Sequence, residues 1–423
     1  MKNSFYNDFD YARIKESTRG SEYRTHFQID RDRIIHSSEF RRLQGKTQVF
    51  LPGEYDFYRT RLTHSIEVAQ IGRSICNFIF KHNTKLFNDK YFIDPDLVES
   101  VCLTHDLGNP PFGHAGERKL NVLMKEYGGY EGNAQTLRSI TETFYRDDNK
   151  RKGMNPTRAF LDGILKYKRL YRTFDNPFNH FLYDEQDEYL KFAFENEDIN
   201  SRLGEEEINS FRSVECQIMD WADDTAYAIN DIVDSISGGF LTIERLASWQ
   251  RANENAITPE QFSLITNMLD WMKAGKFKAK FGSQIGDFIQ AVKIEETENF
   301  MSSKTNRYRY NIVIDDEIYQ KAQLYKRISV ELVFQSAQLH QIEFKGNMMI
   351  EKLFRLFEEN YISTKSRIKL LPDFDDKYIR SEENPNMKAR MICDYMSGMT
   401  DSYAMRTYRR LFDSGYGSMV EVL

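Results

Sequence analysis

Apolar residues recur every three to four positions along most of the chain, which is the spacing of amphipathic helices. The chain holds only nine prolines, so few of these helical periods are interrupted. Alternation of apolar and polar positions is scarce, and residues 308–314 (YRYNIVI) are its best example of a short strand. The pattern therefore predicts an all-α fold with at most minor β content.

The Ser237-Gly238-Gly239 sequence interrupts the helical pattern and is the best internal boundary. We predict a helical core with an N-terminal arm over residues 1–237, which holds every candidate metal ligand. Residues 238–423 are predicted to form a C-terminal helical region that completes the pocket and makes contacts between subunits. Residues 175–210 are predicted to be a loop-bearing insertion near the site. The apolar stripe within 348–357 is predicted to be core rather than interface.

One predicted helix carries the first chemical signal. Asp94 is a suitable N-cap, Pro95 suits the first helical position, and Gly108 is a natural residue just past the C-terminus. The helical period places His105 and Asp106 at the end of its buried apolar face. A buried, unpaired carboxylate is costly, so Asp106 needs a cation or several hydrogen-bond donors. A bound metal ion would meet that need.

Residues 105–117 (HDLGNPPFGHAGE) follow this helix and carry further candidate site residues. Their glycines and prolines cannot all lie in one regular helix, so a rigid, sharply turned loop is expected. It joins the His105-Asp106 doublet to a second pair, His114 and Glu117, which suits acid–base chemistry. Metal ligands at one end and an acid–base pair at the other predict a hydrolytic site. The alternative is a surface turn that contains two histidines by coincidence.

Further ligands should face the same core from other helices. His64 begins a stripe that continues through Val68, Ile71, Ile75 and Ile79, although a histidine there also suits an ordinary core role. Asp223 lies on a helical face whose other members are Glu215, Met219, Tyr227 and Asp231. Its neighbours on the helix are apolar, which favours the buried edge over a solvated face. The predicted cluster is therefore His64, His105, Asp106 and Asp223.

The order and pairing of these residues resemble the HD superfamily of metal-dependent phosphohydrolases. The local sequences are similar to those of the bacterial dGTPase family of deoxynucleoside triphosphate triphosphohydrolases. The similar blocks, spread over roughly residues 30–410, are 41–50 (RRLQGKTQVF), 59–65 (RTRLTHS), 105–117, 131–135 (EGNAQ), 163–167 (GILKY), 222–227 (ADDTAY) and 398–404 (GMTDSYA). The resemblance implies an HD-domain helical core with a C-terminal helical extension.

The resemblance also implies roles for individual residues. It makes His64, His105, Asp106 and Asp223 the ligands of one divalent metal. It assigns phosphate contacts to Arg61, Lys166 and Tyr167, and places His114, held by Glu117, beside the scissile bond. Tyr227 would pack under the sugar and exclude a 2′-hydroxyl, Asp231 would bind the 3′-hydroxyl, and Gln44 is a weaker candidate for the sugar or base.

Two positions depart from the family pattern. Some members carry histidine where this chain has Asn109 or Gly132, so the resemblance does not extend to a mechanism that needs those histidines, and whether a second metal binds is left open. The ligand set of two nitrogens and two oxygens suits Mn²⁺, Fe²⁺, Co²⁺, Ni²⁺ or Zn²⁺, and a triphosphate supplies further oxygens for Mg²⁺. We expect Mn²⁺ or Mg²⁺ to support activity.

The implied reaction converts a deoxynucleoside triphosphate to a deoxynucleoside and inorganic triphosphate. His114 would protonate the departing 5′-oxygen or attack phosphorus directly, and the sequence leaves both roles open. Two other functions remain: an HD phosphohydrolase acting on nucleoside monophosphates or cyclic dinucleotides, and a nucleotide- or DNA-binding regulator without turnover. The sequence leaves the preferred base open, and Asp401 and Tyr403 are equally compatible with pocket and packing roles.

The amino-acid composition restricts the class of protein. Hydrophobic residues make up 40% and charged residues 29%, with 31 Phe and 24 Tyr, as in a soluble, folded protein. A net charge of −6 argues against non-specific nucleic-acid binding by the whole surface. Between Arg19 and Arg61, however, nine basic residues stand against six acidic ones, which suits either a polyanionic ligand or a solvated helix face.

The sequence also gives expectations for the cellular location and the binding partners. Four dispersed cysteines, no signal-peptide core and no long apolar run predict a cytoplasmic protein without a membrane partner. The resemblance adds a homo-oligomer, a hexamer or tetramer, and a nucleotide or single-stranded DNA effector.

Overall fold

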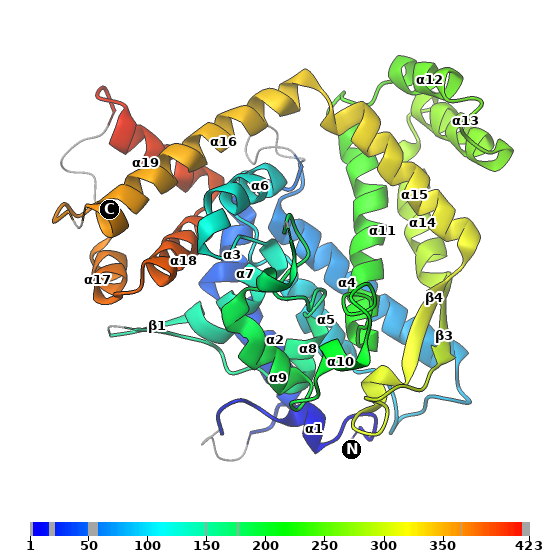
Figure 1. Cartoon of the computed structure of the whole chain (residues 1–423). Helices are drawn as coiled ribbons and strands as arrows, with labels where there is room; N and C mark the ends of the chain where they lie inside the picture. Colours follow the sequence, from blue (N-terminus) through cyan, green and yellow to red (C-terminus); the bar gives the residue numbers. More distant parts are fainter. Residues whose placement is uncertain are drawn as a thin grey trace.

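The fold is a layered set of helices, seen here in a computed structural model of the chain (Figure 1). The structure describes residues 3–16, 22–49, 58–148, 150–175, 177–364 and 366–416. Up to the predicted boundary, the helices are α1 (Asp8–Tyr11), α2 (His26–Ile35), α3 (Ser38–Arg42), α4 (Arg61–His82), α5 (Pro95–Thr104), α6 (Gly113–Leu123), α7 (Gly132–Arg138), α8 (Arg158–Gly163), α9 (Asp187–Ala193), α10 (Ile199–Arg202) and α11 (Val214–Ser237). Beyond it lie α12 (Ile243–Ala252), α13 (Pro259–Lys273), α14 (Phe277–Gln290), α15 (Asp316–Ser329), α16 (Ala337–Glu358), α17 (Asp373–Ser381), α18 (Pro385–Ser397) and α19 (Asp401–Phe412).

The prediction of an all-α fold with minor β content is confirmed. The described residues form two small antiparallel hairpins, β1 (Tyr145–Asp147) with β2 (Lys150–Lys152), and β3 (Val292–Glu296) with β4 (Tyr310–Ile314). Strand β4 is the strand predicted within 308–314, and Val292 pairs with Ile314 in its register. Within the described part of the chain, no helix combines the length and apolarity that crossing a membrane requires.

Helices α4, α5 and α11 form the centre of the molecule. A capping box between Thr60 and Thr63 begins α4, and Asp94 with Pro95 begins α5 as predicted. The stripe that follows His64 on α4 is buried, and burying each such side chain contributes about 1.5–3 kcal/mol before entropic costs. Gly72 lets α4 approach α5 closely, because a Cβ there would lie 2.8 Å from Cys102 Sγ.

The role predicted for Gly108 is wrong. Helix α5 already ends at Thr104, and Gly108 is not in the left-handed conformation of a helix-terminating glycine. The position needs glycine for a different reason: a Cβ there would lie 2.2 Å from the Gly132 carbonyl oxygen and 2.3 Å from the Thr136 nitrogen. The loop after the His-Asp doublet is therefore packed tightly against α7.

The C-terminal helices divide between two hydrophobic clusters. Helices α14 and α15 pack against α11 in the main cluster, whereas α16, α18 and α19 form a second cluster with α6. Figure 1 shows α16 crossing the molecule from α15 to the α17–α19 group. The stripe within 348–357 is confirmed as core, since Met349, Ile350, Leu353, Phe354 and Phe357 are buried. Helix α11 does end at Ser237, and the division into two domains there stays a prediction.

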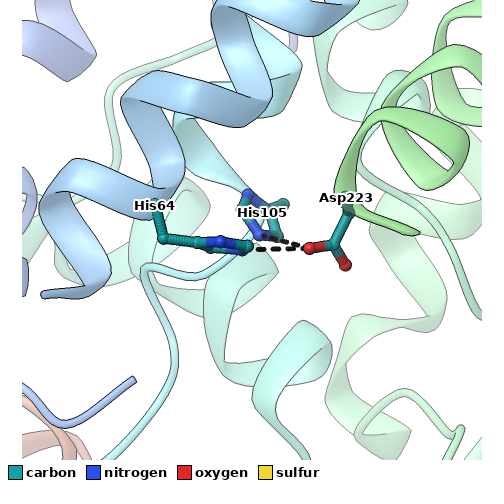
Figure 2. A group of neighbouring side chains, drawn as sticks. All are labelled: His64, His105 and Asp223. Atoms are coloured by element: carbon teal, nitrogen blue, oxygen red, sulfur yellow. Dashed lines mark hydrogen bonds and ion pairs between the residues drawn. The ribbon is translucent and has the colours of Figure 1, made fainter. Parts of the chain in front are cut away.

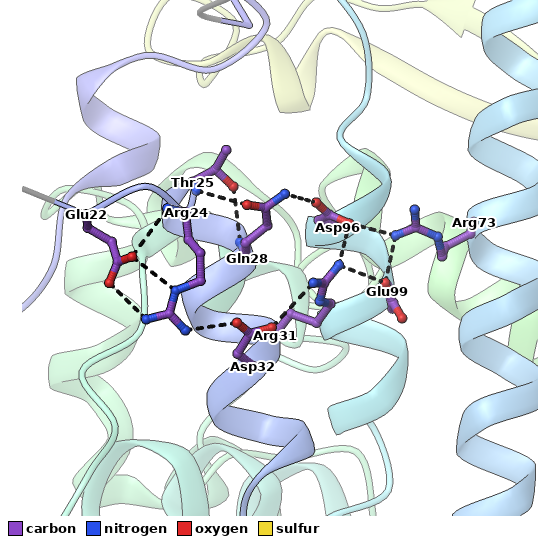
Figure 3. A network of polar contacts seen from close by, with 9 residues as sticks. All are labelled: Glu22, Arg24, Thr25, Gln28, Arg31, Asp32, Arg73, Asp96 and Glu99. Atoms are coloured by element: carbon purple, nitrogen blue, oxygen red, sulfur yellow. Dashed lines mark hydrogen bonds and ion pairs between the residues drawn. The ribbon is translucent and has the colours of Figure 1, made fainter.

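Much of the basic N-terminal region pairs with acids on the surface. Arg24 binds Glu22 and Asp32, and Arg31 binds Asp96, in a network that joins α2 to α4 and α5 (Figure 3). These arginines form a solvated, ion-paired face rather than a free anion site. Arg19 lies outside the described residues. Two other basic residues of the region, Lys46 and Arg61, are buried beside the predicted site.

Candidate metal centre and adjoining cavities

Three of the four predicted ligands converge. His64 from the first turn of α4, His105 just after α5 and Asp223 from α11 place their ligand atoms within 4.8 Å of one another (Figure 2). Asp223 Oδ1 lies 3.0 Å from His64 Nε2 and 3.6 Å from His105 Nε2. Two imidazole nitrogens and a carboxylate oxygen on separate helices form a compact donor set for a divalent metal.

His105 is oriented as a metal-binding histidine. Its Nδ1 lies 2.6 Å from the Cys102 carbonyl oxygen, to which it donates, so Nε2 keeps its lone pair. That Nε2 is buried and has no hydrogen-bond partner among the described residues. Burial alone would lower its pKa, but the nearby Asp106 and Asp223 carboxylates raise the pKa of His105 to about 9. A buried nitrogen without a partner, surrounded by negative charge, fits a bound cation.

Asp106, the fourth predicted ligand, lies at the edge of this cluster. Its Oδ2 lies 3.5 Å from His105 Nε2 and accepts a hydrogen bond of 2.7 Å from Arg61 Nη1, while Asn109 donates to its Oδ1. Burial opposes ionisation, yet Arg61 and the two histidines hold the pKa of Asp106 well below its usual range. The carboxylate is thus charged and correctly placed, and its role as a ligand stays a prediction.

Arg61 is buried with unused donors. The side chain is 2% exposed, and within the described residues its Nε and Nη2 have no hydrogen-bond partner. An arginine that leaves two donors unsatisfied in the interior is unfavourable unless an acceptor binds there. A phosphate, which accepts paired hydrogen bonds from a guanidinium, suits these donors.

His114 and Glu117 form the predicted pair at the start of α6. His114 Nδ1 lies 3.0 Å from Glu117 Oε2, and Glu117 Oε1 accepts a hydrogen bond of 2.7 Å from the Gly132 amide. Burial alone would raise the pKa of Glu117, but the hydrogen bond from His114 outweighs it, so the pKa of Glu117 is lowered. The His114 side chain itself is 66% exposed, so its Nε2 is accessible to a ligand.

Two cavities meet at the cluster. The first, of about 280 Å³, and the second, of about 380 Å³, share Asp106, His114, Arg118 and Asp223. The first is also lined by His105, Asn109, Glu117, Asn121, Tyr130, Glu131, Gly132, Asn133, Lys166, Tyr167, Phe178, Asn179, His180 and Met219. The second is also lined by Thr47, Gln48, Val49, Arg61, His64, Phe112, Gly113, Ala115, Tyr227, Phe334, Leu339, His340, Ile342 and Glu343. A ligand that spans both would pass the cluster at its middle.

Lys166 and Tyr167, whose predicted role is to contact phosphate, line the first cavity. Lys166 Nζ lies 2.5 Å from Asp220 Oδ1, and the charge of that carboxylate raises the pKa of Lys166 although burial opposes it. The Tyr167 ring stacks on His180 at 4.2 Å. His180 belongs to the 175–210 insertion, which therefore borders the site as expected.

The predicted sugar-binding residues are only partly brought together. Tyr227 lines the second cavity. Asp231, one turn further along α11, is buried with a free Oδ2 but lines neither cavity, and burial together with Asp234 raises its pKa well above the usual value. Gln44 is exposed, accepts a hydrogen bond of 3.1 Å from Thr60 and also lines neither cavity. The roles of Asp231 and Gln44 stay predictions.

The sequence did not identify several residues that shape the second cavity. Gln48, with a buried Oε1 that lacks a partner, and Phe334, Leu339 and His340 line it. Phe334 ends a π-helical turn between α15 and α16, Leu339 and His340 lie near the start of α16, and no sequence motif marks these residues. Asp401 and Tyr403 line neither cavity, since Asp401 is buried under the loops and Tyr403 hydrogen-bonds Tyr395 elsewhere.

Comparisons with known proteins place this geometry in a family. Residues 61–228 match the family described as HD domain, and residues 312–410 match the family described as phosphohydrolase-associated domain. Proteins called deoxyguanosinetriphosphate triphosphohydrolase-like are similar over nearly the whole chain. The one from Shewanella sediminis is 34% identical over 96% of both chains, and one from Deinococcus radiodurans is 34% identical over 98% of both. A protein of the same name from Haemophilus influenzae is 32% identical over 94% of this chain and 95% of its own.

Proposed function

The chain belongs to the deoxyguanosinetriphosphate triphosphohydrolase-like family of HD-domain phosphohydrolases, and we propose that it hydrolyses deoxynucleoside triphosphates, dGTP among them. The proposed products are a deoxynucleoside and inorganic triphosphate. The observation that carries the proposal is the meeting of two cavities at the His64, His105 and Asp223 cluster. A triphosphate in one cavity and a nucleoside in the other would bring the α-phosphorus to that point.

The charges of the two cavities support this orientation. Lys166 and Tyr167 in the first cavity supply a cation and a hydroxyl for the outer phosphates. Arg61, beside the cluster, offers Nε and Nη2 to the phosphate next to the scissile bond. The second cavity combines Tyr227, Phe334 and apolar side chains, which suit a sugar and a base.

Two residues of α11 are proposed to select deoxyribose. Tyr227 packs in the second cavity, where its ring would occupy the space that a 2′-hydroxyl needs. Asp231 lies one helical turn away, and its buried Oδ2 has no hydrogen-bond partner within the described part of the chain. It would accept a hydrogen bond from the 3′-hydroxyl after a modest opening of the cavity wall. Gln44 would assist the sugar or base only if its loop moved inward.

The proposed chemistry assigns separate tasks to the chain's residues. Glu117 holds His114 through Nδ1, so Nε2 is left to protonate the departing 5′-oxygen. Arg61 stabilises the charge that develops on the phosphate. Water attacks the α-phosphorus, the bond to the 5′-oxygen breaks, and triphosphate leaves with the new oxygen. In the alternative, His114 Nε2 attacks the α-phosphorus, the bond to the 5′-oxygen breaks with release of the deoxynucleoside, and water then frees triphosphate from His114. A triphosphorylated His114 isolated after an alkaline quench would establish that route.

The centre fits one divalent metal held by His64, His105, Asp106 and Asp223. When bound, the metal supplies Lewis acidity that withdraws charge from the phosphate oxygens and activates the attacking water. Nitrogen donors suit Mn²⁺ better than Mg²⁺, and the oxygens of a triphosphate would be suitable further ligands for either ion. We propose Mn²⁺ or Mg²⁺ as the metal of turnover. The homo-oligomer, the effector and the cytoplasmic setting remain predictions.

A substrate panel tests the proposal. The purified protein is incubated with Mn²⁺ or Mg²⁺ and, separately, four dNTPs, four ribonucleoside triphosphates, nucleoside monophosphates and cyclic dinucleotides. Turnover of dNTPs with weak turnover of ribonucleotides is expected, and Tyr227→Ala should raise ribonucleotide turnover relative to dNTP turnover. Hydrolysis confined to monophosphates or cyclic dinucleotides would contradict the proposal. Nucleotide binding without turnover, in separate incubations and in a mixture of the dNTPs, would instead support a nucleotide-binding regulator.

A further inference from the structure

Asp401 lies at the start of α19, remote in the sequence from the metal centre, yet it is 2% exposed and binds two loops of the second cavity. We propose that Asp401 is a positioning residue of the active site, by which the C-terminal helices fix the loop containing Thr47 and the start of the helix that carries His114. The kinetic consequence rests on the proposed function, whereas the positioning itself does not.

Both oxygens of the Asp401 carboxylate are used. Oδ2 accepts a hydrogen bond of 2.8 Å from the Thr47 amide and another from the Thr47 hydroxyl, and Oδ1 accepts one of 2.9 Å from the Phe112 amide. The two loops have no common partner of this kind elsewhere among the described residues. A single buried carboxylate therefore sets the distance between two walls of the cavity that Thr47 and Phe112 line.

The conformation of Phe112 makes this contact consequential. Phe112 has φ of 65°, in the left-handed region that an aromatic residue rarely adopts, and no side chain caps the helix that begins at Gly113. The hydrogen bond from the Phe112 backbone amide to the Asp401 carboxylate stabilises that turn. Because His114 follows two residues later, a shift of the turn would move its imidazole relative to the metal centre.

The C-terminal region makes a complementary contact with the same turn. The Phe112 ring lies over Gly346 of α16, where a Cβ would come within 2.7 Å of the ring. Beside Asp401, the buried Lys46 amino group donates to the carbonyl oxygens of Asn109, at 2.6 Å, and Ser397, at 2.8 Å. Residues 397–401 thus hold the 46–48 and 109–113 loops by polar bonds, while α16 holds Phe112 by packing.

A conservative substitution separates positioning from general packing. Asp401→Asn keeps the size of the side chain but replaces one acceptor with a donor, which must face either Thr47 or Phe112. Thr47→Val removes only the hydroxyl bond, and Thr47→Ser restores it. Asp376→Asn is a matched control, since Asp376 is equally buried in the C-terminal helices and bonds Tyr361 and Arg380 away from the cavities.

The experiment measures three quantities on the full chain: amide hydrogen exchange at Thr47 and Phe112, bound Mn²⁺ per chain, and kcat/KM for dGTP per metal-loaded site. In Asp401→Asn, both amides are expected to exchange about tenfold faster or more, with kcat/KM reduced about tenfold or more and bound Mn²⁺ unchanged. For amide exchange at Thr47 and Phe112, Thr47→Val should lie between the wild type and Asp401→Asn, and Thr47→Ser should match the wild type. Asp376→Asn should lower Tm without either effect.

Several results would overturn the proposal. Unchanged exchange at both amides in Asp401→Asn, or an equal loss of kcat/KM in Asp376→Asn, would show that Asp401 only contributes to packing. If Asp401→Asn does not fold, equal behaviour of Thr47→Val and Thr47→Ser would have the same meaning. If the wild type turns over no dNTP, the proposed function fails, and local exchange at Thr47 and Phe112 still decides whether Asp401 positions the loops.

Discussion

The guanidinium of Arg61 donates a hydrogen bond of 2.7 Å to Asp106, and two of its other donor atoms are buried without a partner among the described residues. This pairing connects the metal centre to the second cavity, because Asp106 borders the ligand cluster and Arg61 lines the cavity. A substrate phosphate at this point would accept hydrogen bonds from the unused Arg61 donors beside the residues that would hold the metal. The relationship explains why a buried arginine stands beside a histidine and carboxylate cluster, and it yields a prediction for each partner.

Arg61→Lys is expected to weaken the substrate interaction. Lysine keeps the charge but offers a single nitrogen in place of the planar set of donors, so kcat/KM for dGTP should fall about ten- to a hundredfold. Bound Mn²⁺ should be unchanged, since Arg61 is not a ligand. Steady-state kinetics with metal analysis checks this, and Arg355→Lys, an exposed site on α16, is the control. An unchanged kcat/KM would show that Arg61 does not bind the phosphate.

Asp106→Ala is expected to abolish both metal binding and turnover. The substitution removes a predicted ligand and leaves Arg61 as an uncompensated buried charge beside the histidines. Metal content after dialysis and the initial rate with dGTP are the measurements, and Asp270→Ala, at an exposed position of α13, controls for the loss of a carboxylate. Wild-type turnover in Asp106→Ala would refute the proposed centre.

His114→Ala is expected to separate binding from chemistry. The His114 side chain is largely exposed and is paired with Glu117, so the fold, metal content and nucleotide affinity should persist. Loss of the proton donor should lower kcat by about a hundredfold or more. Binding measured in the absence of turnover, together with kcat, tests this. A kcat within about twofold of the wild type would assign the proton transfer to another group.

Lys46 is expected to make stability depend on pH. Burial lowers its pKa from 10.5 to about 7 in the folded protein, whereas the unfolded chain keeps the ordinary value. Between these two values the unfolded state binds more protons, so raising the pH favours folding. The stability of the wild type relative to Lys46→Met should therefore increase as the pH rises from 7 towards 10.5. Urea midpoints at several pH values measure it, and a constant difference between the two proteins would contradict the assignment.

The sequence predicted the parts of the site that depend on helical periodicity. His64, His105 and Asp223 each lie on a buried stripe of one helix, and a stripe is a local property of the chain. The start of the helix at Asp94 and Pro95 was predicted correctly, but its end was not. Gly108 was predicted to terminate the helix, whereas glycine is needed there because the loop packs closely against α7. Tight packing between distant segments leaves no local pattern.

Other parts of the site depend on such long-range packing. The second cavity takes Phe334 from the helical turn before α16 and His340 from the first turn of α16, and no sequence motif marks either residue. Asp401 belongs to a recognisable block, yet only the fold shows that its carboxylate reaches Thr47 and Phe112 rather than a ligand. Asp231 was placed correctly on the face of Asp223 and Tyr227, but the packing around α11 covers its carboxylate.

The central claim is tested most directly by identifying the products formed from dGTP in ¹⁸O-labelled water with Mn²⁺. Attack at the α-phosphorus predicts deoxyguanosine and inorganic triphosphate in equal amounts, with the label in the triphosphate and none in the nucleoside. A chelated sample and Asp106→Ala should yield neither product. Release of orthophosphate with dGDP, or of pyrophosphate with dGMP, would show that a bond other than the one between the α-phosphorus and the 5′-oxygen is broken. Either result would contradict the proposed alignment of the two cavities with the metal centre.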